Sequence, residues 1–277
     1  MTPLNQKAQI FHALHHNQDM LVLANIWDPI SALIVAKAGA KAIATASAAM
    51  AEALGYPDGE QIPKDEMLGA IARIARVVTL PLTVDIERGY GETKSALQDT
   101  IERLIDMGVC GINIEDSLVE GGELRKPSDQ ALRIETVRET AKKLGVNLFI
   151  NARIDCFLQK GITQAEAITD TLLRAKAYEK AGCNGVFPVG VHDLPIIQQL
   201  RTSIKLPLNL IHIPTMTSLQ QLQAAAVDRV SVGPFFMRAS MASVQNIADQ
   251  LLMNADATPL EIAMDKQFSL KALLVNP

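Results

Sequence analysis

Acidic side chains stand at the ends of two apolar runs in the sequence. The run at residues 80–84 is followed by Asp85 and Glu87, and the run after it ends on Glu115. A spacing of two residues directs Asp85 and Glu87 to one side of an extended chain. One such acid is equally typical of a solvated turn, but acids at the ends of two neighbouring runs form a hard-oxygen site suited to Mg²⁺ or Mn²⁺. We therefore predict that Asp85, Glu87 and Glu115 bind a divalent metal.

A cationic side chain ends the next apolar run. Arg153 follows "NLFINA", and a guanidinium can bind both oxygens of a carboxylate or phosphonate as a fork. A structural ion pair of Arg153 with Asp155 or Glu115 is the alternative, and the sequence leaves both open. Several other runs end in small or amide-bearing residues. The polar residues that we expect to bind substrate together with Arg153 are Asn25, Ser47, Asn151 and Asn209.

Composition narrows the class of protein that carries these residues. The chain has 277 residues, 48% of them hydrophobic and 20% charged, and a formal net charge of −4 with no basic cluster. Nucleic acid is therefore excluded as an expected partner. We also expect no membrane partner, because neither a signal peptide nor a run of about 18 apolar residues is visible. Three widely spaced cysteines suit neither disulfides nor a zinc site, which predicts a cytoplasmic protein.

The elements that must position these residues follow a repeated order. Each apolar run is followed by a segment with helical spacing, such as the one in which Leu97, Ile101 and Leu104 share a face. Eight such units without a flexible linker predict an α/β fold of the (β/α)₈ TIM-barrel type, with its site at the carboxyl ends of the strands. An open, doubly wound sheet is the alternative. The expected strands lie within residues 20–25, 41–47, 80–87, 109–116, 147–153, 183–189, 206–211 and 228–233.

The two ends of the chain lie outside the repeated units. We expect the barrel to occupy residues 1–240 and residues 241–277 to form a C-terminal helical extension. The apolar side chains of this extension exceed what one outer helix needs, which predicts burial against another subunit in a homodimer or homotetramer. At the other end, His12, His15 and His16 are expected on the solvated face of a helix, because their spacing is not that of metal ligands.

Five short motifs, in order, resemble the isocitrate lyase/phosphoenolpyruvate mutase superfamily over about residues 20–240. They are "NIWDPISALIVAKAG", "LGYPDGE", "DIERGYG", "INIED" and "INARID". The resemblance implies a TIM barrel with helix-swapped subunits. It also implies that Asp85, Glu87 and Glu115 hold Mg²⁺ directly or through water.

The same resemblance implies roles for three further residues. Asp58, in the second motif, would be a catalytic residue beside substrate and metal, although Pro-Asp-Gly is also a turn signature in its own right. Arg153 would bind the carboxylate of an α-oxo acid. Ser47 would donate a hydrogen bond to an acidic group of the substrate.

One segment departs from the family pattern. Members that cleave isocitrate or methylisocitrate carry Lys-Lys-Cys-Gly-His after the fourth strand, whereas residues 117–130 read "SLVEGGELRKPSDQ". The Lys and polar partner of the mutases and phosphonopyruvate hydrolases have no counterpart in this segment either. We expect a mobile lid whose catalytic acid is Glu120 or Lys126, with Glu123 as a further candidate. A solvated charged loop without chemistry is the alternative.

Together these features predict a Mg²⁺-dependent lyase that breaks a carbon–carbon bond in a small α-oxo or α-hydroxy di-acid. The metal would stabilise the enolate that forms as the bond breaks. Two alternatives stay open. One is phosphorus–carbon chemistry on phosphoenolpyruvate or phosphonopyruvate, and the other is a non-catalytic protein that binds an α-oxo acid.

Overall fold

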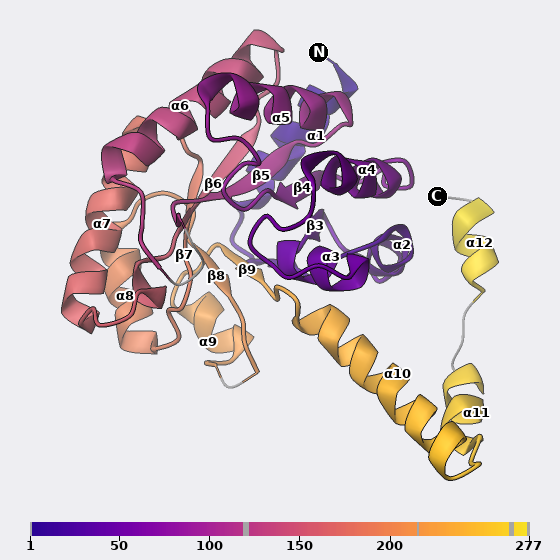
Figure 1. Cartoon of the computed structure of the whole chain (residues 1–277). Coiled ribbons are helices and arrows are strands. Elements are labelled where there is room, and N and C mark those ends of the chain that lie inside the picture. Colours follow the sequence, from indigo (N-terminus) through magenta and orange to yellow (C-terminus); the bar gives the residue numbers. More distant parts are fainter. Residues whose placement is uncertain (1, 119–121, 215, 266–268, 276–277) are drawn as a thin grey trace.

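The expected barrel is confirmed by the computed structural model, which describes residues 2–118, 122–214, 216–265 and 269–275 (Figure 1). Every expected run contains a strand, and the first run is split in two at Ala24. The strands are β1 Leu21–Leu23, β2 Asn25–Ile26, β3 Ile43–Thr45, β4 Leu82–Asp85, β5 Gly111–Glu115, β6 Phe149–Ile154, β7 Gly185–Pro188, β8 Asn209–Ile211 and β9 Arg229–Ser231.

All strand pairs are parallel, and they form two sheets that together make the barrel wall. One sheet has the order β2-β3-β4-β5-β6-β7 and the other has the order β1-β9-β8. At one junction the chain passes directly from β1 into β2. At the other, a single bridge joins Val186 of β7 to Leu208, next to β8. The open doubly wound sheet is therefore excluded.

Helices surround the barrel and follow the strands in the expected alternation. The capping boxes at Asp28, Thr163 and Ser218 fix three helix starts, because each side chain accepts from a backbone N–H of the first turn. The helices are α1 Pro3–Leu14, α2 Pro29–Lys37, α3 Ser47–Leu54, α4 Lys64–Ala75, α5 Lys94–Asp106, α6 Pro127–Lys143, the 3₁₀ turn η1 Cys156–Leu158, α7 Gln164–Lys180, α8 Leu194–Ser203, α9 Leu219–Ala224, α10 Phe235–Met253, α11 Thr258–Asp265 and α12 Leu270–Val275.

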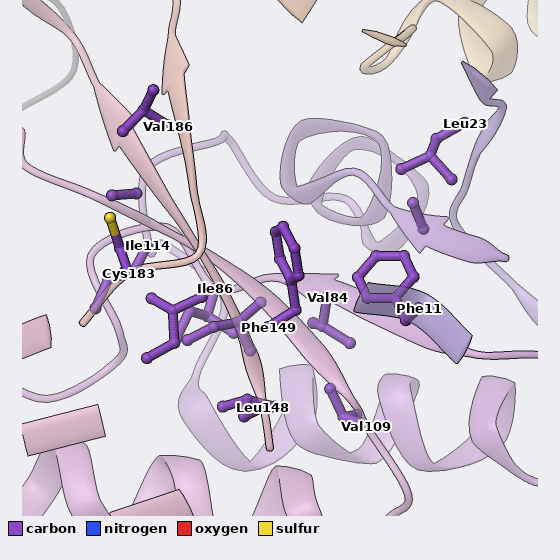
Figure 2. Packing of buried hydrophobic residues seen from close by; sticks show 14 of the residues in the cluster. Phe11, Leu23, Val84, Ile86, Val109, Ile114, Leu148, Phe149, Cys183 and Val186 are labelled. Carbon is purple, nitrogen blue, oxygen red and sulfur yellow. The ribbon is translucent and has the colours of Figure 1, made fainter. Parts of the chain in front are cut away.

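Helix α1 packs against the amino-terminal end of the barrel, where Phe11 meets Phe149 among the buried side chains of Figure 2. The expectation of a solvated histidine face is wrong for His15. Its side chain is 2% exposed and stacks on Phe149, with ring centroids 3.9 Å apart. Burial lowers the pKa of His15 to about 2, so this ring is a neutral part of the core.

Helix α10 extends away from the barrel after its first turns and α11 packs against it, whereas α12 contacts α2 (Figure 1). Helix α10 runs without a break across residue 240, and its first turn still packs on the barrel through Phe236 and Met237. The expected boundary at residue 240 stays a prediction. Large apolar side chains remain exposed along α10, α11 and α12, among them Leu252, Met253, Ile262, Met264 and Leu274. In the part of the chain that the structure describes, every helix is too short or too polar to cross a membrane.

Candidate active site

A cavity of about 110 Å³ lies at the carboxyl ends of the barrel strands. Two of the predicted site residues with opposite charges, Asp85 from β4 and Arg153 from β6, face this same space. The complete lining is Asn25, Ala46, Ser47, Ala48, Asp85, Asn113, Arg153, Phe187, Val189, Ile211, Ser231, Gly233 and Pro234.

Glu87 does not continue the strand alternation that the sequence suggested. Strand β4 ends at Asp85, and Glu87 has a φ of 49°, in the left-handed region. The backbone N–H of Glu87 donates to Asp85 Oδ1 at 3.1 Å, while its own carboxylate accepts from Tyr90 Oη at 2.9 Å and from the backbone N–H of Glu60. Glu87 therefore turns away from the cavity lining and ties two loops together.

The loop that carries Asp58 is held against the end of β4 by these contacts. Glu60 completes the connection, because its Oε1 accepts from the backbone N–H of Tyr90 at 2.8 Å, and Arg88 Nη2 donates to the Gly59 carbonyl at 2.7 Å. Asp58 thereby comes close enough for its charge to raise the pKa of both Asp85 and Glu87. Its buried Oδ1 has no hydrogen-bond partner among the described residues.

The acidic residues near the cavity are held in surroundings that disfavour their charge. Burial raises the pKa of Asp85, that of Glu87 to about 7 and that of Glu115 to about 8. Like charges add to this effect, with Asp58 and Asp85 acting on Glu87. A bound divalent cation would relieve the repulsion and satisfy the unpartnered oxygen of Asp58.

These residues fit a hard cation that keeps several of its waters. The donors are all carboxylates, the ligand class of Mg²⁺ and Mn²⁺. Within the described ranges, no three His, Cys, Asp or Glu side chains are grouped as a complete metal site. Glu115 instead accepts from Ser117 Oγ at 2.5 Å and pairs with Arg153 at 2.7 Å. Metal binding by Asp85, Glu87 and Glu115 stays a prediction.

Arg153 is held in place by two carboxylates. Its Nε and Nη2 donate to the two oxygens of Asp155 at 2.7 and 3.0 Å, and its Nη1 lies 2.7 Å from Glu115 Oε2. Burial would lower the pKa of Arg153, but the charges of Glu115 and Asp155 hold it well above its usual value. These contacts use three of the five N–H groups of a guanidinium. The structural ion pairs therefore exist, and they also fix Arg153 at the edge of the cavity.

Asn113 lies between the cavity and the barrel interior, and the sequence analysis overlooked it. Its Oδ1 accepts from Asn151 Nδ2 at 2.9 Å and from Arg229 Nη2 at 3.2 Å. Because both neighbours are donors, the Asn113 amide must direct its own N–H toward Asp85, where it lowers the carboxyl pKa. Asn113 stands two residues before Glu115 on the same strand, and that alternation was the available signal.

Of the three predicted substrate-binding amides, Asn25 lines the cavity and Asn151 and Asn209 do not. Asn151 and Asn209 are buried inside the barrel wall and do not line the cavity. Asn25 does line it, but its Oδ1 accepts from the backbone N–H groups of Val232 and Gly233, and its Nδ2 donates to Thr45. The sequence analysis expected all three at strand ends, whereas Asn209 begins β8 and β6 continues past Asn151.

Ser47 is the first residue of α3, and it lines the cavity together with Ala46 and Ala48. Ala46, which precedes the helix, has no polar side chain to cap it. The backbone N–H groups of the first turn therefore lie at the cavity without a side-chain cap, beside the Ser47 hydroxyl. Uncapped N–H groups at a helix start attract anions, so this position suits an acidic group of a ligand.

Two backbone hydrogen bonds join the two ends of the predicted lid. The backbone N–H of Leu118 donates to Glu123 and that of Arg125 to Asp116, each at 2.8 Å. Glu120 lies outside the described residues, so its expected catalytic role has no structural test. Glu123 and Lys126 are exposed, and neither lines the cavity. Their catalytic roles stay predictions, as does the mobility of the lid.

The opposite side of the cavity is apolar, which the sequence analysis did not predict. Phe187, Val189 and Ile211 come from the ends of β7 and β8, and Pro234 follows β9. Phe187 is the register partner of Arg153, so the lining changes from charged to apolar between neighbouring strands. An analysis of strand ends selects polar residues, because an apolar residue at a strand end cannot be distinguished in the sequence from a core residue.

The chain is similar to several known proteins over most of its length. The family model described as phosphoenolpyruvate phosphomutase matches residues 11–252. An uncharacterized protein of Mycobacterium tuberculosis is 34% identical over 80% of this chain and 81% of its own length. An oxaloacetate decarboxylase of Pseudomonas fluorescens is 30% identical over 76% of this chain and 72% of its own. A crystal structure of a putative phosphonomutase from Burkholderia cenocepacia has a TM-score of 0.85 and 38% identity, covering 89% of this chain and 99% of that one.

Proposed function

This chain belongs to the phosphoenolpyruvate phosphomutase family, within the isocitrate lyase/phosphoenolpyruvate mutase superfamily, and from that premise we propose that it is a Mg²⁺- or Mn²⁺-dependent carbon–carbon lyase of a small α-oxo di-acid. The observation that carries the proposal is that Asp85 and Arg153 line one small cavity. A carboxylate for a hard cation and a cation for a substrate carboxylate are thus within reach of one small molecule.

The α-oxo acid end of the substrate has two matching groups in the protein. The remaining N–H groups of Arg153 bind a carboxylate, and the first turn of α3 with Ser47 donates to a neighbouring oxygen. Asp85 keeps one orientation, because the backbone N–H of Glu87 and the amide of Asn113 both donate to it. These fixed positions align the bond to be broken with the carbonyl that accepts its electrons.

The reaction places negative charge on the oxygen of the C2 carbonyl group. When the bond between C3 and C4 of an α-oxo di-acid breaks, its electron pair passes into the C2 carbonyl and an enolate forms. A divalent cation, when bound by Asp85 with Asp58 and the neighbouring acids, supplies Lewis-acid stabilisation of that negative charge. Arg153 holds the C1 carboxylate throughout, and C3 then takes one proton.

Turnover in the presence of Mg²⁺ tests this proposal. Oxaloacetate, phosphonopyruvate and methylisocitrate are assayed separately, with an EDTA-treated sample as the control. Cleavage of a carbon–carbon bond only when Mg²⁺ is present would support the lyase. Release of phosphate from phosphonopyruvate would favour the phosphorus–carbon alternative instead. Thermal stabilisation by these acids without any turnover would point to a non-catalytic binding protein.

A further inference from the structure

The cavity has two chemically different sides. Asp85 and Arg153 are the charged residues of the lining that the structure describes, and both belong to β4–β6. From β7 onward the lining is formed mainly by Phe187, Val189, Ile211 and Pro234. Apart from Ser231, the described residues of this side offer no side chain that could hydrogen bond to an anion.

Packing makes the apolar side a close-fitting surface. A Cβ atom added to Gly233 would lie 2.6 Å from Ile211 Cδ1, so this side chain rests directly on the Gly233 backbone. Phe187, at the end of β7, is 4% exposed. The cavity is small, with a volume of about 110 Å³. The apolar side therefore has room for one small group.

A carboxylate placed against this surface would lose its hydration without gaining a partner, which is costly. Arg153 and the start of α3 already account for the α-oxo acid end of the substrate. The group that contacts Phe187, Val189 and Ile211 must therefore be uncharged. An alkyl substituent meets that requirement, and it gains from leaving water.

We infer that Phe187, Val189 and Ile211 form a specificity surface for a small alkyl group on C3 of the substrate, which is then a C3-alkylated 2-oxo di-acid. This inference rests on the proposed lyase function. The C3–C4 bond breaks, its electron pair passes to the C2 oxygen, and the C4 carboxylate leaves as CO₂. C3 takes one proton, and the product is a 2-oxo acid that keeps the alkyl group.

Substrate preference tests the inference directly. With Mg²⁺ present, kcat/KM for 3-methyloxaloacetate should exceed that for oxaloacetate by roughly 4- to 10-fold, the range expected when one methyl group enters an apolar site. Val189→Thr, which keeps the shape but adds a hydroxyl, and Ile211→Thr should each bring the ratio toward one. Val22→Thr, an exposed site on β1, is the matched control and should keep the wild-type ratio. Equal kcat/KM values in the wild type, or a ratio that neither variant changes, would overturn the inference.

Ligand binding separates this inference from the proposed function. Calorimetry with Mg²⁺ compares 2-oxobutyrate with pyruvate, which differ by one methylene group and require no turnover. Tighter binding of 2-oxobutyrate by wild type, reduced in Val189→Thr, would support the specificity surface even if no di-acid were cleaved and the lyase proposal failed. Efficient cleavage of oxaloacetate with no preference between the two monoacids would support the lyase and overturn the surface.

Discussion

The β3–β6 side of the barrel mouth is stabilised by charges and hydrogen bonds, whereas the β7–β9 side is stabilised by packing. On the first side, Arg153 joins Glu115 and Asp155, and Glu87 joins two loops. On the second side, Ile211 packs on the Gly233 backbone beside Phe187. This difference matches the two proposals, which assign the chemical step to residues of β4–β6 and the choice of substrate to residues at the ends of β7 and β8. Variants on either side should therefore produce separable effects.

Asp85→Ala should have the largest effect. The effect should be confined to the β3–β6 side of the barrel mouth. Loss of this carboxylate should weaken Mn²⁺ binding by more than the roughly 10- to 100-fold that loss of an outer-shell partner costs, and should abolish turnover. The apolar side should be unchanged. Calorimetric titration with Mn²⁺ measures the effect, and an affinity equal to that of the wild type would remove Asp85 from the metal site.

Arg153→Lys should follow in magnitude. An ammonium replaces the fork, so α-oxo acid binding should weaken by about 1–3 kcal/mol. The melting temperature should also fall, because Asp155 loses its two-point partner. Titration with pyruvate in the presence of Mg²⁺ checks the first effect and calorimetric unfolding checks the second. Wild-type affinity combined with a lower melting temperature would make Arg153 purely structural.

Gly233→Ala examines the apolar side in the same way. The new Cβ meets Ile211, and φ at this position is 52°, so unfolding free energy should fall by about 1–2 kcal/mol. Binding of 2-oxobutyrate should weaken more than binding of Mn²⁺. Gly145→Ala, with a φ of 72° and no atom within 4 Å of the added Cβ, is the control for backbone strain alone. Equal effects of the two substitutions on ligand binding would contradict the packing argument.

Truncation after Asp256 should have a smaller effect on the site but a visible one on assembly. We propose that the exposed apolar residues of α10–α12 are covered by another copy of the chain. Light scattering should then show a dimer or tetramer for the full chain and a monomer or aggregate after truncation. An unchanged particle mass would refute the proposal.

Lys126→Ala and Glu123→Ala should have the smallest effects of all. Both side chains are exposed and lie outside the cavity lining, so each variant should change kcat by less than about twofold unless the lid closes during turnover. A drop of about 100-fold in one of them, the scale of a general acid, would instead identify a proton donor delivered by the lid. Steady-state kinetics with the best substrate decides between the two.

The sequence predicted the fold and the charged side of the site better than the apolar side. Alternating apolar runs and helices specify a barrel, and a carboxylate or guanidinium at a strand end is conspicuous. Glu87 was misplaced because its left-handed backbone ends the strand alternation, which residue types alone do not reveal. Ile211 was overlooked because an apolar residue at a cavity has the same sequence signature as one in the core.

The division of the barrel wall into two sheets has a mechanical consequence. Strands β2–β7 share a continuous hydrogen-bonded ladder and act as a stiff panel, whereas β1, β9 and β8 form a narrower panel of their own. Few contacts join the two sheets: the Val186–Leu208 bridge connects β7 to the start of β8, and the Asn25 amide connects β2 to the backbone after β9. Strain applied to the barrel should therefore be absorbed by rotation of the narrow panel. We expect the larger sheet, which carries Asp85 and Arg153, to keep its register if the mouth widens beside Ile211.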